Sequence, residues 1–242
     1  MNKIYVVGLG PGDEKNMSVQ AIDILEDCDV IVGYTTYISL LGDRFNHIEK
    51  ISTGMRQETE RCKLCLELAE SGKRVALVCS GDAGIYGLAS LMFELGANHK
   101  SVEIDVIPGI SALNSGAALL GAPLNHDFCV ISLSDLLTPW DLICKRLTAA
   151  AEGDFCMAIY NPASHHRPDH MKNACDVLLR TLSPDTACGY AVNIGRDNEY
   201  TKVCTLGQLR DEELNMFTTV FIGNSRTYID GNKLITPRGY LV

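Results

Sequence analysis

Three glycine-rich turns carry the residues of this 242-residue chain that are best suited to bind a small charged ligand. They span residues 8–13 (GLGPGD), 80–87 (SGDAGIYG) and 108–112 (PGISA); the first two follow apolar strands, and the third follows another strand. Glycine allows the backbone to approach a ligand closely, and turns at the carboxyl ends of parallel strands meet at one edge of the sheet. The pattern therefore predicts a cofactor site built from backbone at such an edge.

The chemistry of these turns argues against a phosphate-rich cofactor. In the first turn, Asp13 stands where the dinucleotide pattern G-x-G-x-x-G needs its last glycine, and Pro11 has no N–H to offer a pyrophosphate. The second turn lacks the Lys-Ser or Lys-Thr pair of a P-loop, and its Asp82 suits ribose hydroxyls or an ammonium group. We infer a nucleoside-like cofactor that carries positive charge. A nicotinamide-dependent oxidoreductase is the weaker alternative.

The elements that must position these turns alternate between apolar runs and amphipathic stretches in the first half of the chain. This βα rhythm predicts a mainly parallel sheet covered by helices. The expected strands are residues 3–8, 29–33, 74–79 and 102–107. The expected helices are residues 17–27, 56–71, 84–95 and 110–120.

The segment GAPLNHD, residues 121–127, breaks this rhythm with glycine, proline and polar residues. We therefore expect two α/β domains, residues 1–121 and 122–242, since a chain of this length can fill two hydrophobic cores. The close spacing of the last strands favours hairpins, and hence a mixed second sheet. The expected strands there are residues 128–133, 154–160, 187–193, 200–204 and 218–223, and the expected helices are residues 139–151 and 168–182.

Composition places the chain among ordinary folded proteins and limits its partners. Hydrophobic residues make up 46% of the sequence and charged residues 21%. The net charge of −9, with acidic excess in both halves, argues against nucleic acid and anionic lipid as partners. The least polar stretch, residues 106–124, contains Pro108 and several glycines, which favours a buried helix over a membrane span. The first residues read as a strand without signal-peptide features, so we expect a cytoplasmic protein.

Ten cysteines and several histidines invite a metal or redox interpretation that their spacing does not support. Cys62 and Cys65 form the only C-x-x-C pair, without a second pair at zinc-finger spacing. His165, His166 and His170 have no acidic or thiol partner at a recognisable spacing and are interpreted as solvated surface residues. We expect no metal site, and we expect the cysteines to pack as small hydrophobic residues.

The same turns resemble the signature motifs of the tetrapyrrole methylases, a family that transfers methyl groups from S-adenosylmethionine (SAM) during corrin and sirohaem synthesis. The motifs occur in the family's order from end to end, with a later match at the Asn193-Ile194-Gly195 turn. Further segments resemble the branch that methylates C17 and contracts the ring of precorrin-3B or cobalt-factor III. These segments are residues 53–58 (TGMRQE), 80–87, 126–140, 160–162 (YNP) and 235–240 (ITPRGY). The alternative is a methylase for another ring carbon, or for an acceptor such as diphthamide or ribosomal RNA.

The resemblance implies two α/β domains that bind SAM in the cleft between them, release S-adenosylhomocysteine and form a homodimer. Methyl transfer from a sulfonium requires alignment of donor and acceptor and exclusion of water rather than a strong base. The implied cofactor contacts are Pro11, Ser80, Gly81, Asp82, Ile85, Ser111, Ala112, Tyr160, Asn161 and Ile194.

Ring contraction additionally needs proton transfers, and the implied tetrapyrrole substrate carries many carboxylates. The candidate acid or base groups are His126, Asp135, Asp13 and Tyr86, with Ser132 and Ser134 as hydrogen-bonding aids. A competing interpretation is that Asp135 and Ser134 only shape the turn before the next helix. The expected substrate-binding residues are Ser132, Arg56, Arg61, Arg167 and Arg196, although surface solvation would also explain the arginines.

Overall fold

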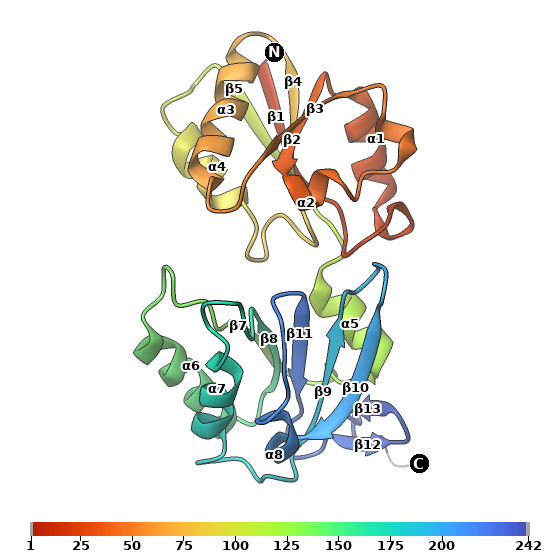
Figure 1. The fold of residues 1–242 in the computed structure, drawn as a ribbon, viewed down its shortest axis with the longest axis vertical. Helices are drawn as coiled ribbons and strands as arrows, with labels where there is room; N and C mark the ends of the chain where they lie inside the picture. The colour runs from red at the N-terminus through yellow and green to blue at the C-terminus, as the bar shows by residue number, and fades with distance from the viewer. Residues whose placement is uncertain (1, 241–242) are drawn as a thin grey trace. The chain divides into compact units, whose positions relative to one another are not determined.

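The computed structural model describes residues 2–240 and divides into two compact units, one ending at Ala112 and the other beginning at Leu113 (Figure 1). The sequence pattern placed this division later, between residues 121 and 122. The difference is helix α5, Ala112–Leu120, which packs on the main sheet of the second unit. A Cβ on Gly116 would lie 2.9 Å from Phe221 Cε2 in that sheet, so the glycine permits a close contact between helix and sheet.

The first unit is built on a five-stranded sheet in the order β3-β2-β4-β1-β5, in which each neighbouring pair is parallel. Strand β4 is buried from Val75 to Cys79, as expected for a central strand covered on both faces. The parallel sheet is confirmed, and only β3 was not predicted, because its sequence EKIST is polar and only partly buried. The strands are β1 (Asn2–Gly8), β2 (Val30–Tyr34), β3 (Glu49–Thr53), β4 (Arg74–Cys79) and β5 (Val102–Ile107).

Helices cover both faces of this sheet. Val30 and Val32 belong to the core under α3 and α4, whereas Ile31 belongs to the core under α1, because side chains alternate along a strand. The helix predicted from residue 84 begins only at Ala89, since the glycine turn before it is irregular. The helices are α1 (Val19–Asp27), α2 (Thr35–Ile38), α3 (Glu58–Glu70) and α4 (Ala89–Gly96), with 3-10 turns η1 (Glu14–Asn16) and η2 (Asp43–Phe45).

The second unit contains a mixed five-stranded sheet in the order β10-β9-β11-β8-β7, as predicted. Strands β7 and β8 are parallel, whereas β11 runs antiparallel to both β8 and β9, and β10 runs antiparallel to β9. Strands β7, β8 and β9 therefore share one direction, and their carboxyl ends lie at the same edge. The strands are β7 (Phe128–Ser132), β8 (Cys156–Tyr160), β9 (Ala187–Val192), β10 (Tyr200–Thr205) and β11 (Thr218–Ile222).

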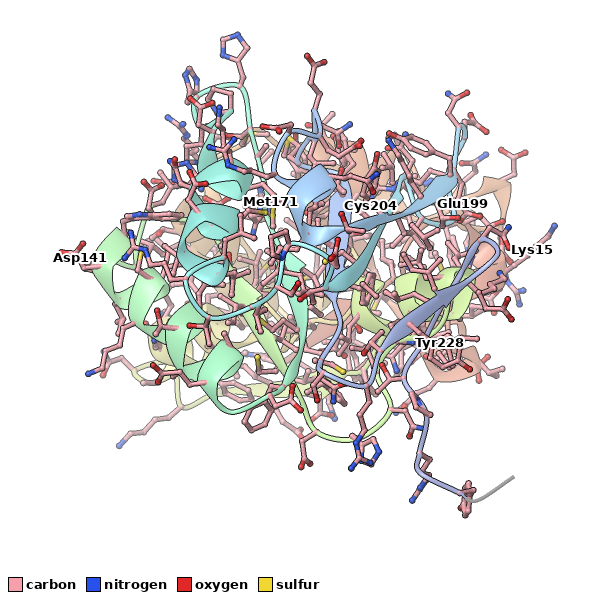
Figure 2. The ribbon with its side chains drawn as sticks, turned by 90° about the horizontal axis from the view of Figure 1, so that it is seen from below. Lys15, Asp141, Met171, Glu199, Cys204 and Tyr228 are labelled. Carbon is pink, nitrogen blue, oxygen red and sulfur yellow. The ribbon has the colours of Figure 1, made fainter. Side chains whose placement is uncertain are left out.

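Alternating side chains again divide the core of the second unit between two faces. Met157 and Ile159 pack with α6 and α7, whereas Ala158 packs with α5 on the opposite face. Figure 2 shows Met171 on α7 and Cys204 on β10. Both side chains belong to the hydrophobic core on the face covered by α6 and α7. The remaining helices are α6 (Trp140–Glu152), α7 (His170–Leu178) and α8 (Leu206–Leu209).

A small three-stranded sheet, which was not predicted, ties the C-terminal segment to the residues after α5. Thr236 is 1% exposed, and its hydroxyl donates to the carbonyl of Pro123 at 2.7 Å. The strands are too short to show a sequence pattern: β6 (Gly121–Ala122), β12 (Tyr228–Asp230) and β13 (Lys233–Ile235). Tyr228 marks β12 in Figure 2.

The cysteines are free thiols and, apart from Cys129 and Cys144, they are buried. Burial raises the pKa of Cys62 to about 12 and that of Cys79 to about 11, which suppresses the reactive thiolate. We expect iodoacetamide at mildly alkaline pH to modify the folded protein slowly, beginning at Cys144 or Cys129. The same reagent should modify all ten cysteines in denaturant. Mass spectrometry of timed samples measures this, and rapid modification of Cys62 in the native protein would contradict the burial.

Candidate functional site

The three glycine turns of the first unit meet at the carboxyl edge of its sheet and are joined through their backbones. Gly10 N–H donates to the carbonyl of Gly81 at 3.0 Å, and Gly81 N–H donates to the carbonyl of Gly10 at 2.7 Å. Gly10 has φ of +80° and Gly81 has φ of +68°, a region that favours glycine. The predicted edge, formed by turns that follow β1, β4 and β5, is therefore present.

Two further glycines allow a contact that no side chain would permit. A Cβ on Gly8 would lie 2.7 Å from the backbone nitrogen of Gly109 and 2.7 Å from the carbonyl oxygen of Gly81. A Cβ on Gly109 would overlap the carbonyl oxygen of Gly81 and the backbone of Gly8. We name the surface made by Gly8, Gly10, Gly81 and Gly109 the glycine cradle.

Asp82 connects two of these turns. Its Oδ1 accepts from the backbone N–H of Gly84 at 2.8 Å and of Ile85 at 3.1 Å, and its Oδ2 accepts from Gly109 N–H at 3.0 Å. Three donors therefore converge on one carboxylate. The sequence pattern suggested only a ligand contact, whereas in the structure Asp82 shapes the turn and fixes it to the start of the next one.

The other predicted residues of the first unit differ in exposure. Ser111 is 3% exposed, and Pro11 is also buried. Tyr86 has φ of +55° with its side chain 54% exposed, a backbone conformation that is uncommon for an aromatic residue. Asp13 is exposed, and its Oδ1 accepts from Asn16 Nδ2 at 2.7 Å, so its carboxylate holds the turn at η1. The remaining predicted cofactor contacts of the first unit are Ser80 and Ile85, which are partly exposed, and Ala112, which is the last residue of the unit.

Arg61 does not have the solvent-exposed position that a carboxylate clamp requires. It is 3% exposed, its Nε donates to Thr53 Oγ1 at 2.6 Å, and its Nη2 donates to the carbonyl of Gly54 at 2.9 Å. The guanidinium therefore ties the end of β3 to α3. Arg56, in the same turn, is exposed and has φ of +63°.

Arg61→Lys is expected to lower the free energy of unfolding by about 1–3 kcal/mol, because lysine keeps the charge but loses the forked donors. Urea unfolding followed by circular dichroism measures the change. Arg56→Lys is the matched control, and a change within about 0.5 kcal/mol is expected for this exposed side chain. Equal effects of the two substitutions would contradict the structural role of Arg61.

In the second unit, predicted residues gather where β7, β8 and β9 end. Ser132 pairs in register with Tyr160, and the next residue, Asn161, donates from Nδ2 to Ser132 Oγ at 2.9 Å. The Tyr160 hydroxyl accepts from Leu113 N–H at 2.8 Å, and thus satisfies a donor in the first turn of α5. Ile194 is 6% exposed, and a Cβ on Gly116 of α5 would lie 3.0 Å from its Cδ1. Tyr160 and Ile194 therefore both support α5.

Asp135 faces two basic side chains from the segment after β8. Its Oδ1 lies 3.5 Å from Arg167 Nη1, and its Oδ2 lies 3.1 Å from His170 Nε2. Burial raises the pKa of Asp135, but interactions with His170 and Arg167 outweigh it and hold that pKa below the ordinary value of 3.8.

The His170 ring packs edge-on against Trp140 with 4.8 Å between centroids. The expectation that His170 is a solvated surface residue was wrong, since its side chain is only 16% exposed, whereas His165 and His166 are exposed.

His126 is not brought together with these residues. It precedes β7 and lies at the amino end of that strand, whereas Ser132 is the last residue of the strand and Asp135 follows it. A five-residue strand separates the two ends by about 16 Å. Arg196 follows β9 and lies at the same edge as Ser132, with its guanidinium 5.3 Å from the centroid of the Phe217 ring.

The comparisons with known proteins agree with the motifs. Residues 3–210 match the family model described as Tetrapyrrole (Corrin/Porphyrin) Methylases. The chain belongs to this family. The family predicted from the motifs is thereby confirmed.

This methylase has close relatives over its full length. It is 46% identical to a probable cobalt-factor III C(17)-methyltransferase of Salmonella typhimurium, covering 98% of this chain and 99% of the relative. A precorrin-3B C(17)-methyltransferase of Sinorhizobium is 37% identical, covering 98% of this chain and 96% of the relative. A cobalt-factor III methyltransferase of Priestia megaterium is 44% identical over 98% of this chain, which spans only 45% of that longer relative.

Solved structures show the same fold. The crystal structure of the methyltransferase CobJ matches the methylase with a TM-score of 0.89 and 37% identity, covering 97% of this chain and 99% of that one. A uroporphyrin-III C-methyl transferase of Thermus thermophilus complexed with S-adenyl homocysteine has a TM-score of 0.70 at 19% identity, covering 91% of this chain and 92% of that chain.

Within residues 2–240 of the methylase, no helix is long and apolar enough to cross a membrane. The same residues contain no group of three or more His, Cys, Asp or Glu placed to hold a metal ion.

Proposed function

We propose that this methylase transfers a methyl group from SAM to C17 of cobalt-factor III and contracts the macrocycle, giving a C17-methylated, ring-contracted cobalt tetrapyrrole. The observation that carries the proposal is the 46% identity to the Salmonella relative over 98% of this chain and 99% of the relative. Four relatives named for the cobalt-containing substrate are 39–46% identical to this chain, compared with 37% for a relative named for precorrin-3B. This difference favours the cobalt-containing substrate over the metal-free one.

The glycine cradle fits the donor that the family implies. Its three turns pack so closely that a Cβ at Gly8 or Gly109 would collide with their backbone, and it has no Lys-Ser or Lys-Thr pair for a phosphate. When bound, SAM supplies an electrophilic methyl group and leaves as S-adenosylhomocysteine. The proposed contacts in the first unit are Pro11, Ser80, Gly81, Ile85, Ser111 and Ala112, with Asp82 shaping the turn. The proposed contacts in the second unit are Tyr160, Asn161 and Ile194.

The residues of the chain itself bind SAM and the tetrapyrrole, orient them toward each other and exclude water. The displacement at the methyl group needs little further activation. We assign the peripheral carboxylates of the tetrapyrrole to Arg56, Arg167 and Arg196, with Ser132 as a hydrogen-bonding partner. Tyr86 and Asp13 are the remaining candidates for proton transfer during ring contraction. A homodimer belongs to the same proposal on the family resemblance alone, and so does the cytoplasmic location expected from the sequence.

Calorimetry distinguishes this proposal from its main alternative. We expect binding of SAM and of S-adenosylhomocysteine, and no binding of NADH. Binding of NADH alone would favour a nicotinamide-dependent oxidoreductase. Turnover of cobalt-factor III beside metal-free precorrin-3B then tests the substrate, and faster methylation of the cobalt-containing form is expected. A product methylated at another ring carbon would assign the chain to a different branch of the family.

A further inference from the structure

We propose that residues 134–138 form a substrate loop, in which Leu136 and Leu137 pack on the apolar face of the tetrapyrrole. Asp135 is the positioning residue that fixes this loop to the segment after β8. The inference rests on the proposed function and deepens it, because it names the side chains that recognise the macrocycle.

The tip of the loop exposes two neighbouring leucines. Leu137 is 98% exposed and Leu136 is 63% exposed. Single exposed leucines are ordinary on protein surfaces, but an adjacent pair at a loop tip is an apolar patch without a partner among the described residues. The leucines follow β7, and the loop therefore begins at the edge where Ser132 and Asn161 lie.

The base of the loop is held firmly, so the leucines are presented in a defined place. Leu133 is fully buried, and its N–H donates to the carbonyl of Tyr160 at 2.9 Å. Ser134 N–H donates to Ser132 Oγ at 3.2 Å, and Asp135 pairs with Arg167 and His170. A loop that merely connected β7 to α6 would not need these anchors.

Ionisable groups at the base face one another and hold the loop in place. Arg167 Nη1 and His170 Nε2 are shielded from solvent, and neither has a hydrogen bond of good geometry within residues 2–240, although both face Asp135. Arg167 is held in place by Ser164, because its Nε donates to Ser164 Oγ at 3.2 Å. An apolar tip on a base held in this way is complementary to the flat apolar face of a macrocycle.

The test replaces both leucines and measures tetrapyrrole binding by absorbance titration with cobalt-factor III. We expect Leu136→Ser with Leu137→Ser to raise the Kd for the tetrapyrrole about 100-fold. The Kd for SAM and the Tm should stay unchanged, because both side chains are exposed in the free protein. Val19→Ser on α1 is the matched control, since Val19 is 74% exposed and should alter none of these quantities.

Asp135→Asn tests the positioning role separately. It should raise KM for the tetrapyrrole about tenfold while kcat at saturating tetrapyrrole stays nearly constant. A fall of kcat with KM unchanged would overturn this role and make Asp135 a catalytic residue.

Three outcomes of the leucine experiment would overturn the loop assignment. These are an unchanged Kd for the tetrapyrrole, an equal loss of SAM binding, and a change confined to oligomeric state in light scattering. The last would place the leucines at a contact between copies of the chain. Failure of the proposed function would give a different result from failure of the loop assignment. The wild-type protein would bind the tetrapyrrole and the leucine variants would bind it more weakly, but no methyl group would be transferred to C17.

Discussion

Gly109→Ala should lower the affinity for SAM by about 100-fold or more, corresponding to about 2.8 kcal/mol of binding free energy. The new Cβ would overlap the carbonyl oxygen of Gly81 and the backbone of Gly8, so the glycine cradle must open to accept it. Overpacking of this kind also costs about 1–3 kcal/mol of folding free energy. Calorimetry with SAM measures the first effect and urea unfolding the second.

The matched control is Gly207→Ala in α8 of the second unit. A Cβ at Gly207 would find its nearest neighbour, the Pro184 carbonyl oxygen, at 3.4 Å, an ordinary contact. Alanine also has the higher helix propensity, so neither stability nor SAM affinity should fall. If both variants bound SAM as the wild type does, the cofactor would not lie on the glycine cradle.

Asp82→Asn should weaken SAM binding by about 10-fold to 100-fold and destabilise the first unit by about 2–4 kcal/mol. The carboxylate accepts from three backbone N–H groups, and an amide would turn its own donors toward at least one of them. Thermal unfolding in the presence and absence of SAM measures both effects.

Asp43→Asn is the control for this substitution. Asp43 begins η2 and accepts from Asn46 Nδ2 at 2.9 Å in an exposed position. Its replacement should change stability by no more than about 0.5 kcal/mol and leave SAM binding intact. An Asp82→Asn protein with normal stability and normal SAM affinity would show that the three hydrogen bonds do not hold the cradle together.

The sequence predicted the sheets better than the roles of individual side chains. The strands β1 and β4, which support the first two glycine turns, have apolar runs, and the turns that follow them are recognised by their glycines. Strand β3 and the small sheet lacked such runs. The domain boundary was placed late because α5 reads as one more helix of the first half, whereas its glycine face packs on the second sheet.

Side-chain roles were missed where a motif spans more than one element. The block of residues 126–140 contains all of β7, so His126 and Asp135 lie at opposite ends of that strand. Arg61 was expected to bind substrate carboxylates, although it lies four residues before buried Cys65 on the same face of α3. This helical spacing was the signal for its burial. Nothing local in the sequence pairs Asp135 with His170, since the fold brings together the loop after β7 and the first residue of α7.

The most direct test is a single reaction of purified protein with cobalt-factor III and SAM labelled with ¹³C in its methyl group. We expect one labelled carbon in the product, assigned by NMR to C17 of a contracted macrocycle, and one equivalent of S-adenosylhomocysteine. Label at another ring carbon, or no transfer by protein that is folded and binds both molecules, would contradict it.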